Sequence, residues 1–513
     1  MTLAYNSPLF YAGFLPVIAI IYQIMPKKYR WAVLLVADYA FFFVWSKFLL
    51  VYNVATTFIT YFFGRKLGSM KKAPEGVDRK VFKKKKHRIV VLGVLINLGV
   101  LIVLKYTNFI GSSVASLFGS SFTAMSIAVP IGISYYTLQC ISYLSDVSNK
   151  KIEAETNFFK FALYTSFFPT ILEGPITRFG DMAENLFAGH SITAQNLAEG
   201  YERIIWGLFK KMVIADHMAP VVTTIFRDHS DNGGLCLTGA IFCTIQLYMD
   251  FAGTIDIAIG AGKIFGITIA ENFRQPFFAK NAGDFWHRWH ITLGTFFRDY
   301  IFYPVSLSKP IQNMTKHLTK KGHKMLARYL GPAIALLFVW LANGFWHGPY
   351  WTYVFYGLYY FVFMIIEMFL EKPFEASCAK SHWDINGWGI KTFRFIKLFI
   401  IVIIGEMFFR ASTFALGWKM FTNIFLNFNA KGWISTLPYL GMDVWDFVTV
   451  GLALVVVIIV SVLKEKKYPI REKFESMPTA ARWGILYALI FSIILFGAYG
   501  PGYDAVAMMY AGF

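Results

Sequence analysis

Long apolar runs separated by short polar loops are the dominant pattern along this 513-residue chain. A helix needs about 20 apolar residues to cross roughly 30 Å of hydrocarbon. Candidate runs lie near residues 8–25, 31–46, 48–63, 89–106, 127–145, 158–172, 203–226, 235–265, 328–345, 349–370, 393–411, 446–463 and 482–498. Several are short or broken by Gly and Pro, so the pattern predicts about 11 to 13 transmembrane or re-entrant helices. Interrupted helices survive in a membrane only where protein or a watery cavity covers the freed backbone, which predicts a central cavity.

The composition agrees with an all-α integral membrane protein. The chain is 56% hydrophobic and only 15% charged, with a mean hydropathy of +0.50, whereas soluble domains carry roughly a quarter charged residues. We therefore expect a single polytopic membrane domain over residues 1–513. The first apolar stretch, Pro8 to Ile24, lacks a basic leading region and a small-residue cleavage site. It is predicted to be a retained helix rather than a removed signal peptide.

The net charge of +19 comes from basic blocks placed between the apolar runs. These blocks are Lys27 to Arg30, Arg65 to Arg88, Lys316 to Arg328 and Lys464 to Lys473. Clustered cations also bind nucleic acid, but this spacing is typical of cytoplasmic loops. The blocks predict topology and contact with anionic membrane lipid, and no nucleic-acid partner. The first two blocks are separated by two spans, which places the N-terminus outside.

Most templates for metal or nucleophilic catalysis are missing from the sequence. There is no C-x-x-C pair, no zinc spacing, no P-loop, no G-x-S-x-G and no H-E-x-x-H. The four cysteines (Cys140, Cys236, Cys243 and Cys378) therefore support no redox or metal prediction. No metal and no permanently bound cofactor are expected.

The segment GDFWHRWHITLGTFFRDYIFYP, residues 283–304, combines aromatic and charged residues. Its large apolar residues recur at three and four positions and predict one stripe of an amphipathic helix near 284–304. His287 and Arg298 lie mostly on the other side, and His290 lies at its edge. The segment is too polar to span a membrane, so we expect a helix in or near the interface. An interfacial anchor without chemistry explains the same pattern.

The segment WLANGFWHGPYW, residues 340–351, places His347 within an apolar stretch and directly before Gly and Pro. This pattern predicts a helix end at membrane depth. Ionisable residues there usually face an internal cavity, and imidazole suits a base near neutral pH. A neutral core histidine bonded to a backbone carbonyl fits equally well.

Two carboxylates, Asp250 and Asp256, lie within the apolar segment 246–276 and imply internal partners. Gly260 and Gly262 have the wrong spacing for a dinucleotide loop. We expect them to allow close helix packing in the membrane.

Five segments, in this order, resemble the membrane-bound O-acyltransferase family, and above all its bacterial branch of alginate O-acetyltransferases and teichoic-acid D-alanine transferases. They are VPIGISYYTLQCISYLSDV (129–147), FPTILEGPITRF (168–179), the segment 250–276, DFWHRWHITLGTFFRDY (284–300) and GFWHG (344–348). The resemblance spans about residues 5–370, with core motifs over 129–370 and extra C-terminal spans over 393–513. The sequence departs from the family's usual pattern at residues 303–310 and at Glu173. These differences bear on which acceptor and which partner surface the resemblance implies.

The resemblance implies helices arranged around a central funnel, with His347 as the general base and His290 positioning the reactants. It further implies substrate-positioning or structural roles for a set of neighbouring residues: Asp250, Asp256, Arg298, Asp299, His287, Trp289 and Trp346.

The implied activity is acyl transfer, with acetyl as the favoured group, across a bacterial cytoplasmic membrane. The donor is a cytoplasmic thioester, either acetyl-CoA or a phosphopantetheine carrier protein. The acceptor is an extracytoplasmic hydroxyl of a cell-surface polysaccharide, reached directly or through a hydrolase-like partner protein. D-alanyl transfer to teichoic acid is the alternative within the family. A transporter or polysaccharide flippase without acyl chemistry, and an inactive assembly subunit, are the alternatives from other classes.

Overall fold

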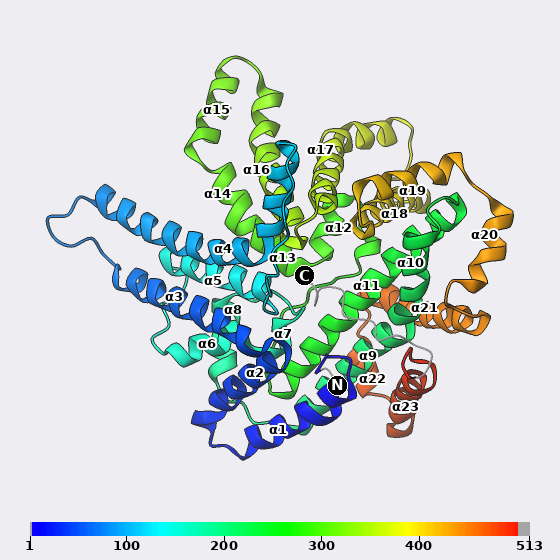
Figure 1. The fold of residues 1–513 in the computed structure, drawn as a ribbon, viewed down its shortest axis with the longest axis horizontal. Helices are drawn as coiled ribbons and strands as arrows, with labels where there is room; N and C mark the ends of the chain where they lie inside the picture. The colour runs from blue at the N-terminus through cyan, green and yellow to red at the C-terminus, as the bar shows by residue number, and fades with distance from the viewer. Residues whose placement is uncertain (1–2, 501–513) are drawn as a thin grey trace. The chain divides into compact units, whose positions relative to one another are not determined.

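The computed structural model describes residues 3–500, and these residues form helices and loops without any strand (Figure 1). The described chain divides into two compact units, residues 3–204 with 254–271, and residues 205–253 with 272–500. Two helices, α9 (Ala194–Leu208) and α11 (Gly233–Ile264), contribute residues to both. The all-α fold predicted from the apolar pattern is confirmed.

The first unit contains the N-terminal helices, of which α3, α4 and α5 pack side by side (Figure 1). Its elements are η1 (Leu9–Phe14), α1 (Leu15–Ile24), η2 (Lys27–Tyr29), α2 (Arg30–Ser46), η3 (Lys47–Leu49), α3 (Leu50–Ser69), α4 (Arg79–Leu117), α5 (Ile133–Ser148), α6 (Phe158–Ser166), α7 (Phe168–Ile171) and α8 (Phe179–Phe187).

The second unit is built around the antiparallel pair α16 and α17 (Figure 1). Its elements are η4 (Phe209–Ala215), α10 (Asp216–Asp228), η5 (Pro276–Phe278), α12 (Ala282–Arg288), α13 (Ile291–Phe297), η6 (Arg298–Phe302), α14 (Tyr303–Ser306), α15 (Lys309–Lys320), α16 (Lys324–His347), α17 (Trp351–Lys380), α18 (Trp388–Arg410), α19 (Phe414–Leu426), α20 (Ala430–Thr436), η7 (Leu437–Tyr439), α21 (Val444–Glu465), α22 (Ile470–Glu475) and α23 (Thr479–Phe496).

Seven helical stretches among the described residues are long and apolar enough to cross a membrane. They are Lys27–Ser69, Arg79–Leu117, Gly233–Ile264, Lys324–His347, Trp351–Lys380, Val444–Glu465 and Thr479–Phe496. Leu452 and Ile458 of α21 are 65% and 57% exposed, as lipid-facing side chains would be. The chain is a multi-pass membrane protein, as predicted. The larger number of about 11 to 13 transmembrane or re-entrant helices stays a prediction.

Several buried polar groups of the first unit are satisfied by the chain itself. The buried carboxylate of Asp38 on α2 accepts hydrogen bonds from the Phe168 backbone N–H at 2.7 Å and from the Ser166 hydroxyl at 3.4 Å. The Tyr5 hydroxyl donates to the Phe168 carbonyl. Because hydrocarbon offers no water, such internal bonds are required wherever a helix is interrupted at membrane depth. Here they stabilise the break between α6 and α7.

Helices α16 and α17 approach so closely that glycine is required where they cross. A Cβ atom at Gly344 would lie 2.5 Å from the Tyr353 carbonyl oxygen, and one at Gly357 would overlap the Trp340 carbonyl oxygen. Small residues at helix crossings allow this backbone approach in membranes. The pair therefore forms a rigid frame for the residues at the end of α16.

We expect Gly357→Ala to destabilise the protein by about 1–3 kcal/mol, because the added methyl group overpacks the crossing. The thermal unfolding midpoint of the detergent-purified chain measures this effect. Gly451→Ala on α21 is the matched control, since a Cβ atom there meets nothing within 4 Å. Equal midpoints for the two variants would contradict the assignment of Gly357 to a tight crossing.

Candidate active site

The segment predicted as one amphipathic helix near 284–304 is helical but not continuous. Helix α12 ends at Arg288, and α13 begins at Ile291. Between them His290 adopts a left-handed backbone with φ of +46°, which a non-glycine residue rarely adopts without tertiary support. The three- and four-residue spacing of apolar residues continues through the break, so the sequence pattern missed it.

Asn272 supplies the support for this break. Its backbone carbonyl accepts from the Ile291 N–H at 3.0 Å. Its side-chain Oδ1 accepts from the Thr292 N–H at 3.0 Å and from the Thr292 hydroxyl at 2.9 Å. These bonds cap the first turn of α13 from a distant loop, a task that a local N-cap side chain usually performs. Asn272 was not anticipated, because only the folded path brings it to α13.

The same amide fixes the tautomer of His290. The Nδ1 of His290 lies 3.3 Å from Asn272 Oδ1, which already accepts from a backbone N–H and is therefore the amide oxygen. Nδ1 must carry the proton, so Nε2 has a free lone pair. Nε2 is buried and has no hydrogen-bond partner among residues 3–500. Burial holds the pKa of His290 well below its usual range, which keeps the imidazole neutral.

A cavity of about 440 Å³ adjoins His290 in the second unit. Its walls are mainly apolar, with residues such as Leu293, Leu336, Val339, Met364 and Met368. Three lining residues, Trp286, His290 and Asn343, carry buried polar atoms without a partner in the described chain: Trp286 Nε1, His290 Nε2 and Asn343 Nδ2. Buried polar atoms are rarely left unpaired. One acceptor and two neutral donors at a mainly apolar cavity are suited to hold a hydroxyl and a carbonyl oxygen.

His347 is the last residue of α16, as the Gly-Pro sequence predicted. Its side chain is buried and packs edge-to-face on Trp346 and Phe409, with ring centroids 5.0 and 5.1 Å apart. The Trp346 ring also packs on His290 at 5.3 Å. The two histidines predicted to be catalytic thus contact the same indole, although they lie on different helical segments.

A buried carboxylate lies near His347. The His347 ring packs on Tyr356 at 5.8 Å, and the Tyr356 hydroxyl donates to Glu406 Oε1 at 2.9 Å. Glu406 is fully buried on α18. An acidic residue in the apolar run 393–411 was the signal that could have found it. Asn343 had a signal too, because it lies four residues before His347 on the same helix.

The two predicted aspartates both form internal ion pairs. Asp250 lies 3.0 Å from Lys211, which also pairs with Asp216 at 2.5 Å, and all three residues are buried. In the first unit, Asp256 pairs with Arg203 at 2.6 Å. These ion pairs supply the internal partners that the apolar run implied, and they offset part of the cost of burying charge.

The remaining predicted residues surround the cavity or pack away from it. His287 and Arg298 line the cavity, and both are exposed. Arg298 pairs with its neighbour Asp299 at 2.8 Å. Trp289 is buried against Phe285 and Phe273 and does not line the cavity.

The predicted close packing at Gly260 and Gly262 can be compared with the structure of the first unit. A Cβ atom at Gly260 would lie 2.5 Å from the Gly200 carbonyl oxygen, and one at Gly262 would lie 2.6 Å from the Ile269 side chain. Gly260 is therefore a site of close helix packing, as predicted, whereas Gly262 packs against the loop that follows α11.

An apolar cavity with neutral hydrogen-bonding groups, inside a multi-pass helical protein, suits an enzyme that transfers a carbonyl-bearing group within the membrane. Comparison with known proteins identifies the class. The model of the membrane-bound O-acyltransferase family matches residues 81–319. A probable alginate O-acetylase from Azotobacter vinelandii is 30% identical over 427 residues, which cover 82% of this chain and 78% of the relative. The chain belongs to the membrane-bound O-acyltransferase family.

Other relatives differ in the activity that their names record. A peptidoglycan O-acetyltransferase from Helicobacter pylori is 30% identical over 451 residues, covering 80% of this chain and 77% of the relative. A teichoic acid D-alanyltransferase from Bacillus subtilis is 29% identical over 250 residues, covering 47% of this chain and 60% of the relative. The protein is thus an O-acyltransferase that uses an acyl donor, and family membership argues against the transporter alternative.

We expect Asn272→Ala to lower the unfolding free energy by about 1–3 kcal/mol, because it strands the Thr292 donors and the His290 Nδ1–H. Asn272→Asp retains an acceptor oxygen and should lose less. Thermal unfolding of both purified variants tests this. Equal losses in the two variants would show that the oxygen is not the group that matters.

Proposed function

We propose that this protein transfers an acetyl group from a cytoplasmic thioester to a hydroxyl of a cell-surface polysaccharide, at the cytoplasmic membrane of a bacterium. The donor is acetyl-CoA or a phosphopantetheine carrier protein. The acetyl group reaches the polysaccharide directly or through an extracytoplasmic partner protein. The names of the Azotobacter and Helicobacter relatives, which match most of this chain, favour acetyl and a polysaccharide acceptor.

The observation that carries the proposal is the cavity in which one acceptor and two neutral donors are buried without partners. Asn343 Nδ2 and Trp286 Nε1 are hydrogen-bond donors, so they suit the carbonyl oxygen of a thioester as it gains negative charge. The Nε2 of His290 accepts, so it suits the hydroxyl of the acceptor. The walls are mainly apolar, and a less polar environment than water strengthens these interactions.

The proposed reaction needs one base and one leaving group. The hydroxyl oxygen attacks the carbonyl carbon, and the proton passes from the hydroxyl to an imidazole nitrogen. The C–S bond then breaks, and the same proton is transferred to the departing thiolate. We assign the base to His347, because of its position in the GFWHG segment, and the orientation of the hydroxyl to His290.

D-alanyl transfer is the second candidate, supported by the match to the Bacillus D-alanyltransferase over 47% of this chain. The chemistry at the carbonyl is the same, so the two candidates differ in the acyl group, its donor and the final acceptor rather than in the reaction.

We expect His347→Ala to reduce ester formation by about 10²–10⁴-fold, which is the usual contribution of a general base. His290→Ala should reduce it as well, and His317→Ala, an exposed histidine on α15, should leave it unchanged. The measurement is the mild-alkali release of ester-linked groups from envelopes that contain equal amounts of each protein. Mass spectrometry of the released acid distinguishes acetate from D-alanine.

Wild-type activity in the His347→Ala variant would remove His347 as the base. Release of D-alanine instead of acetate would replace the proposed donor by the second candidate. An envelope without any ester that depends on the protein would overturn the proposed acceptor.

We expect Asn343→Asp to lower the turnover rate by about 10²–10³-fold, because loss of the amide donor weakens stabilisation of the oxyanion. The apparent KM for the thioester should change little. Initial rates of acyl transfer from labelled acetyl-CoA in inverted membrane vesicles measure both constants. Asn313→Asp on α15, an exposed position, is the matched control. A change in KM alone would assign Asn343 to ground-state binding.

A further inference from the structure

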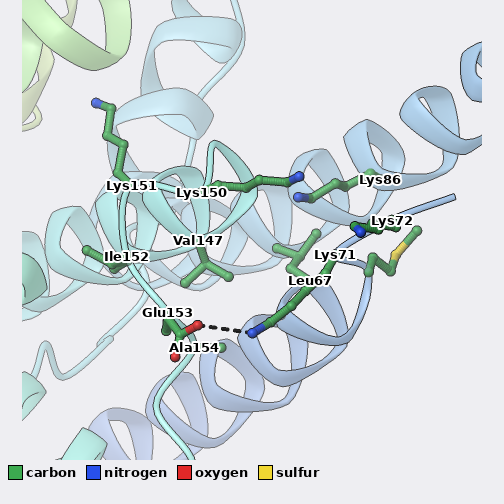
Figure 2. Close-up of a pocket in the computed structure, with 12 residues that line it drawn as sticks. Leu67, Lys71, Lys72, Lys86, Val147, Lys150, Lys151, Ile152, Glu153 and Ala154 are labelled. Carbon is green, nitrogen blue, oxygen red and sulfur yellow. Dashed lines mark hydrogen bonds and ion pairs between the residues drawn. The ribbon is translucent and has the colours of Figure 1, made fainter.

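A second cavity, of about 320 Å³, lies in the first unit where α3 ends, α4 begins and the loop after α5 passes (Figure 2). Its apolar part includes the half-buried Met70, Ile152 and Ala154, which lie with the buried Leu67 of α3 and Val147 of α5. Its charged part is lysine-rich, with Lys71, Lys72, Lys86, Lys150 and Lys151 set against Glu153. The cavity thus combines a strongly basic lining with an apolar floor.

The charges around this cavity are only partly balanced by the described chain. Lys71 pairs with Glu153 at 3.0 Å, and Lys151 lies 3.4 Å from Asp146. The other three lysines, Lys72, Lys86 and Lys150, form no ion pair with any residue between 3 and 500.

Two of these three lysines face each other. Figure 2 shows the ammonium groups of Lys86 and Lys150 directed toward one another, and the two charges interact repulsively. Lys86 comes from α4 and is half-buried, whereas Lys150 follows α5. Two cations held at one opening, with no carboxylate between them, favour a bound anion.

The loop that carries Lys150 is held in place by several bonds. The Glu155 N–H donates to the Tyr143 hydroxyl at 2.9 Å, and the Tyr61 hydroxyl donates to the Thr156 carbonyl at 2.5 Å. Lys150 has a left-handed backbone with φ of +59°, a conformation more common for Gly or Asn at a helix end. The Lys150 side chain therefore extends from a turn whose backbone is held by hydrogen bonds.

The cavity lies at the basic end of two candidate membrane spans, Lys27–Ser69 and Arg79–Leu117. The basic block from Arg65 to Arg88 joins these spans, and such loops remain on the cytoplasmic side. The cytoplasmic leaflet carries anionic lipid at this level. A lipid places its phosphate among the lysines and its glycerol and upper chains on the apolar floor, whereas a free phosphate leaves that floor unused.

We propose that this cavity binds a phosphate group, and that the headgroup of an anionic phospholipid in the cytoplasmic leaflet supplies it. Lys86 and Lys150 hold the phosphate from two sides, and Lys72 adds a third positive charge. This binding site is separate from the cavity proposed for acyl transfer, so its test does not depend on the proposed function.

Binding of lipid to the purified, delipidated full chain tests this proposal. The probes are phosphatidylglycerol, phosphatidylcholine and inorganic phosphate, each titrated by native mass spectrometry. The test variant is Lys86→Gln with Lys150→Gln. The control, Lys83→Gln with Lys84→Gln, removes the same charge from exposed positions of α4 that do not line the cavity. Lys86→Arg with Lys150→Arg retains the charge and reports on folding together with the unfolding midpoint.

We expect the wild type to bind phosphatidylglycerol in preference to phosphatidylcholine, and the test variant to bind it at least about tenfold more weakly. The control and the arginine variant should stay within about twofold of the wild type. Equal weakening in the test and control variants would overturn the site in favour of general surface charge. Unchanged affinity in the test variant would overturn it outright. Lysine-dependent binding of inorganic phosphate without phosphatidylglycerol binding would support the phosphate site and overturn the lipid source.

Discussion

Hydrocarbon gives a polar side chain no water, so each hydrogen bond inside this protein has to come from the chain or from a substrate. Asp38 and the break between α6 and α7 satisfy each other in this way, and Asn272 does the same for the break at His290. A buried polar group without a hydrogen-bond partner is therefore unusual, and it indicates where a substrate could supply the bond. Among the groups without a partner in the described chain, Trp286 Nε1, His290 Nε2 and Asn343 Nδ2 line one cavity of the second unit.

The irregular backbone at His290 serves this cavity directly. A continuous helix through residues 284–304 would keep His290 in regular register, whereas the left-handed turn lets Asn272 hold both α13 and the imidazole. One amide oxygen therefore decides the helix start, the ring tautomer and the direction of the lone pair. The close α16–α17 crossing at Gly344 and Gly357 then positions the end of α16, where Asn343 lines the same cavity.

The sequence was sufficient for the helical class, for membrane insertion and for the helix end at His347, because these depend on local hydropathy and on Gly and Pro. It was not sufficient for the break at His290, since the apolar spacing continues across it and the residue that enforces it lies 18 positions away. The same limit applies to Asp250. Its isolation in an apolar run predicted an internal partner, but only the packing of helices identifies Lys211. A role that depends on which residues are neighbours in the folded structure cannot be predicted from the sequence pattern alone.

In the second unit, the buried ion pairs and the unpaired polar groups of the cavity are formed by different residues. The buried side chains of Lys211, Asp216 and Asp250 pair with one another, and none of the three lines the cavity. The buried unpaired groups at the cavity wall are neutral, an imidazole, an amide and an indole, whereas the lining Arg298 is exposed and pairs with Asp299. An unpaired charge in such surroundings would cost far more than an unpaired neutral group. Burying a neutral donor without a partner costs less free energy than burying an unpaired charge. The hydrogen bonds of such donors strengthen once negative charge develops on a carbonyl oxygen. A mainly apolar cavity therefore favours neutral side chains of this kind over unpaired charges.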